Sequence, residues 1–90
     1  MAATIMASEE VLSREISGET VLLDLKTENY FGLGGVGSRA WQLISAGTNL
    51  QELTTVLAAE FEVSEETLAV DLERFVADLA DAGLVATNNG

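Results

Sequence analysis

The chain contains no cysteine, no histidine and no proline, and only four of its 90 residues are basic. Without cysteine and histidine it has no disulfide bond, no zinc-finger site, no thiol nucleophile and no imidazole acid or base. Fifteen acidic residues against four basic ones give a formal net charge of −11. Such a charge repels phosphate backbones. The composition therefore argues against nucleic-acid binding and against most catalytic chemistry.

The chain also lacks long apolar runs. The first seven residues have neither the basic start nor the apolar stretch of a signal peptide, and no run approaches the roughly 20 residues of a membrane span. We therefore expect a cytoplasmic protein with no membrane partner. We assign one domain to residues 1–90 with an ordered core of about 8–86, and we expect the ends, including residues 87–90, to be frayed.

Three short strands are predicted from three apolar stretches, residues 11–16, 20–25 and 30–33. The connections between them are short and polar, with a turn at residues 17–19, and they favour an antiparallel meander. In the middle strand Leu22 faces away from Val21 and Leu23, so we expect cover on both of its faces. The first and third strands then form the edges of the sheet.

Three helices are predicted after the strands, so the expected fold class is α+β. The first covers residues 38–46, and Gly47 ends it. Trp41 is expected to anchor this helix in the core. Three glycines precede it, but they lack the pattern of a phosphate-binding loop, so we interpret them as a corner between strand and helix: Gly34, Gly35 and Gly37.

The second and third helices carry capping signals at their starts. Residues 48–51 read as a capping box that begins at Thr48, and Asn49 with Glu52 offers an alternative register. Ser64 precedes two glutamates and is typical of an N-cap. Gly83 ends the third helix.

The third strand is the most promising place for function. It has no proline and no charge between Tyr30 and Leu33. At a sheet edge, such a strand offers backbone donors and acceptors to a guest strand. By alternation Phe31 and Leu33 face the core, whereas Tyr30 faces the surface and is the better candidate for recognition.

Particular residues argue against other functions. The acids of the third helix are interpreted as solvated, and Ser38 has no neighbouring base, so no catalytic residue, metal ligand or cofactor is predicted. An acidic carrier domain would use a helix-start serine such as Ser38, but the strands do not suit that all-helical fold. A winged helix that binds nucleic acid would need more cations than Arg74 on its third helix. Both remain as less favoured alternatives.

The order and spacing of several segments resemble the PqqD-like proteins, the stand-alone form of the RiPP recognition element. The resemblance extends over about residues 11–85. Its carriers are residues 18–25 (GETVLLDL), 30–33 (YFGL), 36–43 (VGSRAWQL), 71–75 (DLERF) and 83–85 (GLV). The YFGL strand followed by GxGxxxW is most similar to members that serve lasso-peptide pathways. Gly34-Gly35 departs from the polar residue that often follows the Leu in this family.

The resemblance implies a winged-helix-like fold and a peptide site. In the family, the leader of a ribosomally made precursor peptide adds as a strand to the third strand and packs beside the third helix. Carried over to this sequence, the binding residues are Asn29, Tyr30, Phe31, Gly32, Leu68, Asp71, Leu72 and Phe75. Asp71 is expected at the rim of the groove, either orienting the leader or simply solvated.

The resemblance also implies the partners. In lasso-type systems the family hands the leader to a separate leader peptidase, whereas in the cofactor-type system the recipient is a radical enzyme. Local similarity favours the first. We therefore expect a precursor leader peptide and a processing enzyme as partners, with the PqqD-type delivery of a peptide to a radical enzyme as the alternative.

Overall fold

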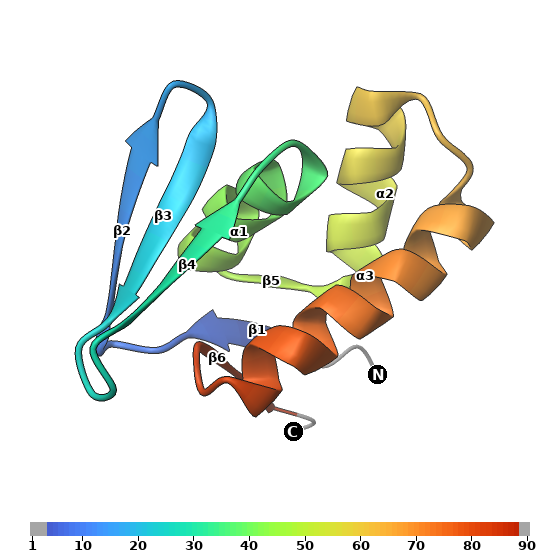
Figure 1. The fold of residues 1–90 in the computed structure, drawn as a ribbon. Coiled ribbons are helices and arrows are strands. Elements are labelled where there is room, and N and C mark those ends of the chain that lie inside the picture. Colours follow the sequence, from blue (N-terminus) through green and yellow to red (C-terminus); the bar gives the residue numbers. More distant parts are fainter. Residues whose placement is uncertain (1–3, 89–90) are drawn as a thin grey trace.

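The computed structural model describes residues 4–88, and this part of the chain forms six strands and three helices (Figure 1). In chain order the elements are β1 (Thr4–Ala7), β2 (Val11–Ile16), β3 (Glu19–Asp24), β4 (Asn29–Leu33), α1 (Val36–Ala46), β5 (Thr48–Asn49), α2 (Leu50–Phe61), α3 (Glu65–Asp81) and β6 (Val85–Asn88). The α+β class is as predicted, and the three predicted strands and three predicted helices are present in the predicted order as β2, β3, β4, α1, α2 and α3.

The predicted meander is present as an antiparallel sheet with the order β2-β3-β4. Ser17 and Gly18 form a two-residue turn between β2 and β3, and both have positive φ, 52° and 82°. This backbone matches the right-handed twist of the two strands. β4 begins at Asn29, one residue earlier than predicted, and β2 and β4 are the edges of this sheet.

A second small sheet, with the order β5-β1-β6, was not predicted. β1 brings Ile5 into the core, where 1% of it is exposed, and it pairs with β6. Thr87 and Asn88 were expected to be frayed, but they lie opposite Ile5 and Thr4 in this sheet. Asn89 and Gly90, part of the same prediction, lie outside the described residues. This pairing joins segments near opposite ends of the sequence. A local sequence pattern does not predict a contact between residues so far apart in the chain.

Of the glycines around α1, Gly35 and Gly47 act as predicted, at a corner and at a helix end, whereas Gly37 lies within the helix and, like Gly34, has no positive φ. Gly35 precedes the helix with φ 55°, and Gly47 follows it with φ 94°. Both values lie in the region that glycine adopts without steric cost. The helix itself starts at Val36, two residues before the predicted start.

The helix caps settle the two registers left open for α2. The Asn49 side chain accepts a hydrogen bond from Glu52 N at 2.8 Å, so the Asn49 register is correct and the box beginning at Thr48 is wrong. Ser64 caps α3 as predicted, accepting from Thr67 N at 3.2 Å.

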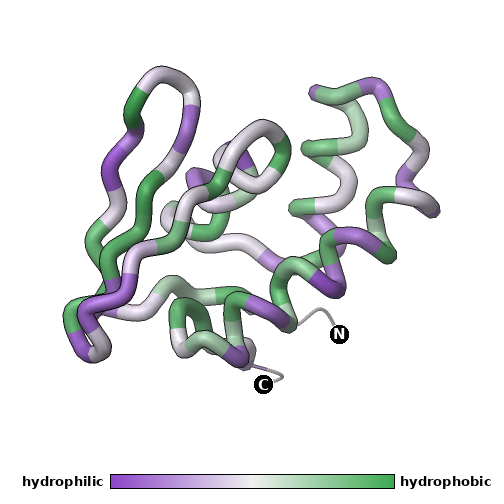
Figure 2. Tube along the Cα trace, in the orientation of Figure 1, coloured by the Kyte–Doolittle hydropathy of each residue, from purple (hydrophilic) through white to green (hydrophobic). Residues whose placement is uncertain are grey.

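The core lies between the sheets and the helices, and α3 shows alternating polar and apolar residues along its length (Figure 2). In β3 the buried residues Thr20, Leu22 and Asp24 share one face, whereas Val21 and Leu23 on the opposite face are half-exposed. The expected cover on both faces of β3 is therefore wrong, because α1 packs against β3 on the Leu22 side only (Figure 1). Trp41 is buried as predicted. No helix among residues 4–88 has the length and apolarity of a membrane span.

Candidate functional site

The candidate site begins at the outer edge of β4. No strand of the described chain pairs with β4 on the side away from β3. The turn between β2 and β3 makes Ile16 and Glu19 a hydrogen-bonded closing pair. The hydrogen bond from Leu25 N–H to Glu10 O, with an N···O distance of 2.9 Å, fits the same alternation of bonded and non-bonded pairs. Bonded and non-bonded pairs alternate along an antiparallel ladder, so this phase fixes the direction of every backbone group in the sheet.

The alternation turns the backbone N–H and C=O of Tyr30 and Gly32 away from β3. Asn29, Phe31 and Leu33 direct theirs toward β3, opposite Asp24, Leu22 and Thr20. The free edge of β4 therefore presents two consecutive sets of donor and acceptor groups. An extended peptide with the matching register can pair with them.

The side chains of β4 divide as predicted. Tyr30 is 72% exposed and lies on the face away from the helices, opposite Leu23. Phe31 and Leu33 are half-buried and pack against the core. Asn29 and Gly32 are exposed. A Cβ at Gly32 would meet no atom within 4 Å, so neither face of the strand is obstructed there.

A small pocket lies between α3 and the start of α1. Its volume is about 170 Å³, and it is lined by Val36, Gly37, Asp71, Leu72 and Phe75. Gly37 is the contact point, because a Cβ on it would lie 3.5 Å from Phe75 Cε1 and 3.8 Å from Leu33 Cβ. The absence of that Cβ leaves the Phe75 ring accessible beside the end of β4.

The four helix residues predicted to bind the leader do not all lie at this pocket. Asp71, Leu72 and Phe75 all line the pocket, with Leu72 buried, Phe75 half-buried and Asp71 exposed. Leu68 is buried in the core and does not line the pocket, nor do the four predicted strand residues. Val36 and Gly37 were missed. Both belong to the segment 36–43 that carries the resemblance, and the sequence predicted only a corner at Gly37.

The chemistry of this pocket is apolar with one acid at its rim. None of its lining residues is basic. Among residues 4–88 no group of three or more acids is placed to hold a metal ion. Ser38, the residue that a carrier domain would use, is buried, and its Oγ lies 2.5 Å from Thr20 Oγ1. A hydroxyl in that position is not accessible for attachment of a prosthetic group.

An open strand edge next to an apolar pocket is a geometry that can bind an extended peptide by strand addition. The family model described as "Coenzyme PQQ synthesis protein D (PqqD)" matches residues 19–85. The chain belongs to this family. Proteins of the family are non-catalytic, as the sequence predicted.

One solved structure supports both the fold and the family. It is described as "TbiB1 in Complex with the TbiA(beta) Leader Peptide" and is 40% identical to this chain. The alignment covers 89% of this chain and 93% of that one, with a TM-score of 0.85. No curated protein matches the chain.

Proposed function

We propose that this protein binds the leader region of a ribosomally synthesised precursor peptide and presents it to a separate processing enzyme. The observation that carries the proposal is the outward direction of the Tyr30 and Gly32 backbone groups beside the apolar pocket of α3. The similarity to TbiB1, whose structure contains a leader peptide, supports the same mode of binding.

In this mode the leader forms a fourth strand next to β4. Its backbone pairs with Tyr30 and Gly32, which supplies affinity that depends little on sequence. The leader residue opposite Phe31 shares the inward face with Phe31, so its side chain points toward α3. An apolar side chain there reaches the pocket formed by Leu72 and Phe75. Alternate residues of the leader thus provide specificity.

Asp71 is the only charged residue at the pocket, and it lies on its exposed rim. We propose that it pairs with a basic or hydrogen-bond-donating residue of the leader. Such a contact at the rim affects association more than the stability of the fold. The net charge of −11 favours a leader with basic residues near this point.

The recipient enzyme is proposed to be a leader peptidase of the lasso-peptide type, because YFGL and GxGxxxW are most similar to members from those pathways. The alternative recipient is a radical enzyme, as in PqqD-type delivery, and the description of the matched family favours it. The two are distinguished by which enzyme, added to the loaded protein, forms a ternary complex in gel filtration.

The test of binding uses two labelled probes at moderate salt. One is the cognate leader peptide, and the other is a duplex DNA. We expect saturable binding of the leader and none of the DNA, because the surface is acidic. Micromolar binding of DNA without binding of the leader would refute the proposal and favour the winged-helix alternative.

A further inference from the structure

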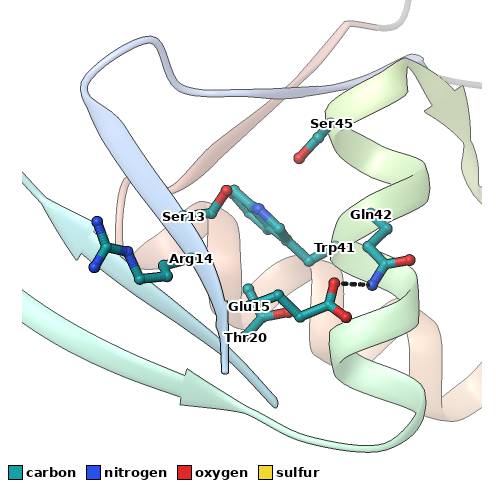
Figure 3. Close-up of a pocket in the computed structure, with 7 residues that line it drawn as sticks. All are labelled: Ser13, Arg14, Glu15, Thr20, Trp41, Gln42 and Ser45. Atoms are coloured by element: carbon teal, nitrogen blue, oxygen red, sulfur yellow. Dashed lines mark hydrogen bonds between the residues drawn. The ribbon is translucent and has the colours of Figure 1, made fainter. Parts of the chain in front are cut away.

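The opposite edge of the sheet also lies beside a pocket, and its chemistry is different. This pocket, of about 260 Å³, lies between β2 and α1 (Figure 3). Its lining is mostly polar: Ser13, Arg14, Glu15, Thr20, Trp41, Gln42 and Ser45. Glu15 and Gln42 join the two elements through a hydrogen bond of 2.6 Å from Gln42 Nε2 to Glu15 Oε2.

The indole of Trp41 brings an unused donor to this pocket. Trp41 is 3% exposed, and its Nε1 is the one buried side-chain nitrogen or oxygen of residues 4–88 without a hydrogen-bond partner. A buried N–H without an acceptor costs about 1–3 kcal/mol. Figure 3 shows the indole among Ser13 of β2 and Gln42 and Ser45 of α1. An acceptor that enters between β2 and α1 would therefore recover this cost.

The backbone of β2 offers the means to deliver that acceptor. The phase of the ladder that turns Tyr30 and Gly32 outward in β4 turns Ser13 and Glu15 outward in β2. These are also the residues whose side chains share the inward face, since they lie opposite Leu22 and Thr20. A strand paired with Ser13 would therefore direct its own residue at that position into the pocket, toward Trp41.

We propose that β2 is a second strand-addition site, and that its occupant is an extended segment of a partner protein with an asparagine or glutamine side chain opposite Ser13. A carboxamide oxygen accepts from Trp41 Nε1, and the amide nitrogen donates to a hydroxyl of Ser13 or Ser45. A carboxylate is disfavoured by Glu15, and an aliphatic side chain leaves the indole N–H without an acceptor. The site is separate from β4 and does not depend on what binds there.

The probes for this site are three capped tripeptides, acetyl-Val-Asn-Val-N-methylamide and the same peptide with Leu or Asp in the middle. They are titrated into the full ¹⁵N-labelled chain and followed by NMR. Trp41 is the only tryptophan, so its indole N–H gives a single unambiguous resonance. We expect the Asn peptide to shift this resonance and the Ser13 amide saturably. The Leu peptide should bind about tenfold more weakly, as the loss of one hydrogen bond implies, and the Asp peptide more weakly still.

Two variants, each with a control, separate backbone from side-chain contacts. Ser13→Pro removes an outward N–H and should abolish binding of the Asn peptide, whereas Ser13→Ala retains the N–H and should keep most of it. Trp41→Phe keeps the aromatic ring without the donor and should weaken the Asn peptide about tenfold at the Ser13 amide. The Leu peptide should be unaffected by Trp41→Phe.

Three results would overturn the proposal. Equal shifts with all three peptides would remove the carboxamide preference, and shifts at the Gly32 amide but not at Ser13 would assign the peptides to β4. A Ser13 resonance that moves with protein concentration alone would make a second copy of this chain the occupant. Binding of the leader is measured separately, on the parent chain and on Gly32→Pro. A failure of the peptides to bind at β2 is thereby distinguished from a failure of the proposed function at β4.

Discussion

The edges of the main sheet, β4 and β2, are alike in backbone and opposite in side chains. β4 turns the groups of Tyr30 and Gly32 away from β3, and β2 turns those of Ser13 and Glu15, together with Val11, whose N–H donates to Ser8 O. At β4 the neighbouring pocket is formed largely by Leu72 and Phe75, whereas at β2 it is mostly polar. We infer from this difference that an open strand edge supplies affinity that depends little on sequence. The adjacent helix then determines which side chain of the guest strand is preferred.

The largest expected effect concerns Trp41, which lies under the β2 edge. Trp41→Ala should cost about 3–5 kcal/mol in the free energy of unfolding, a large share of the total for a domain of this size. Urea denaturation followed by circular dichroism measures it. Phe75→Ala, at the half-buried residue by the β4 edge, should cost less. Normal stability of Trp41→Ala together with lost leader binding would instead assign Trp41 to the recognition surface.

Gly32→Pro tests whether the β4 edge pairs with a guest strand. The Gly32 N–H points away from β3, so proline removes a donor for the leader and no bond within the sheet. Leader affinity should fall about tenfold or more, because a pairing hydrogen bond is lost and the ring obstructs the guest. Isothermal titration calorimetry measures the affinity.

The matched control at this position is Gly32→Ala, which keeps the N–H and meets no atom within 4 Å. It should bind the leader nearly as well as the parent. Unchanged affinity of Gly32→Pro, with the helical circular dichroism signal intact, would move the binding site away from the β4 edge.

Asp71→Asn should have a smaller effect, because Asp71 is exposed at the rim of the pocket. The substitution keeps the shape and removes the charge. We expect association with a basic leader to slow a few-fold at low salt and this difference to shrink at high salt, as for other rim charges. Asp78→Asn, an exposed acid of α3 away from the pocket, is the control. Identical on-rates for parent and both variants in stopped-flow measurements would leave Asp71 a solvated acid.

The smallest effect is expected at the ion pair between α1 and α2, which lies at neither edge. Arg39 Nε donates to Glu60 Oε1 at 2.8 Å, and this hydrogen bond lowers the pKa of Glu60 below its usual 4.5. Because the folded-state pKa is depressed, the stabilising contribution is present above about pH 4.5 and is lost as the pH falls through the lowered pKa.

The measurement is the difference in free energy of unfolding between the parent and Glu60→Gln, followed against pH. This difference should be small at neutral pH, since both side chains are more than one-third exposed, and should vanish in acid. Leader binding should not change. A difference that grows as the pH falls would contradict the assigned cause of the pKa shift.

The sequence predicted the features that depend on local pattern. Alternation and short polar connections indicated the meander, and the uncharged stretch from Tyr30 to Leu33 indicated the edge that β4 forms. Capping residues located the starts of α2 and α3 to within one residue. The resemblance placed Leu68 of α3 in the binding site, whereas its side chain is buried in the core. A helix residue that faces the core and one that faces a groove can be equally apolar, so the sequence does not separate them.

Features that depend on distant contacts were not predictable in this way. β1 and β6 stabilise each other from opposite ends of the sequence, and each is only four residues long. Val36 and Gly37 line the pocket because α1 packs close to α3, which no single segment encodes. The unpartnered Trp41 N–H is visible only once β2 and α1 are placed side by side.

The pairing of Thr4 with Asn88 brings the first and last described residues together as neighbours in one sheet. A short Gly/Ser tether can therefore join them, and new termini can be opened at the exposed Ser17-Gly18 turn, as circular permutation requires. The same proximity makes the domain a cassette that can be inserted into a surface loop of a host enzyme. In such a fusion both edges of the main sheet stay accessible, which would let an engineer bring a substrate peptide and its modifying enzyme together on one scaffold.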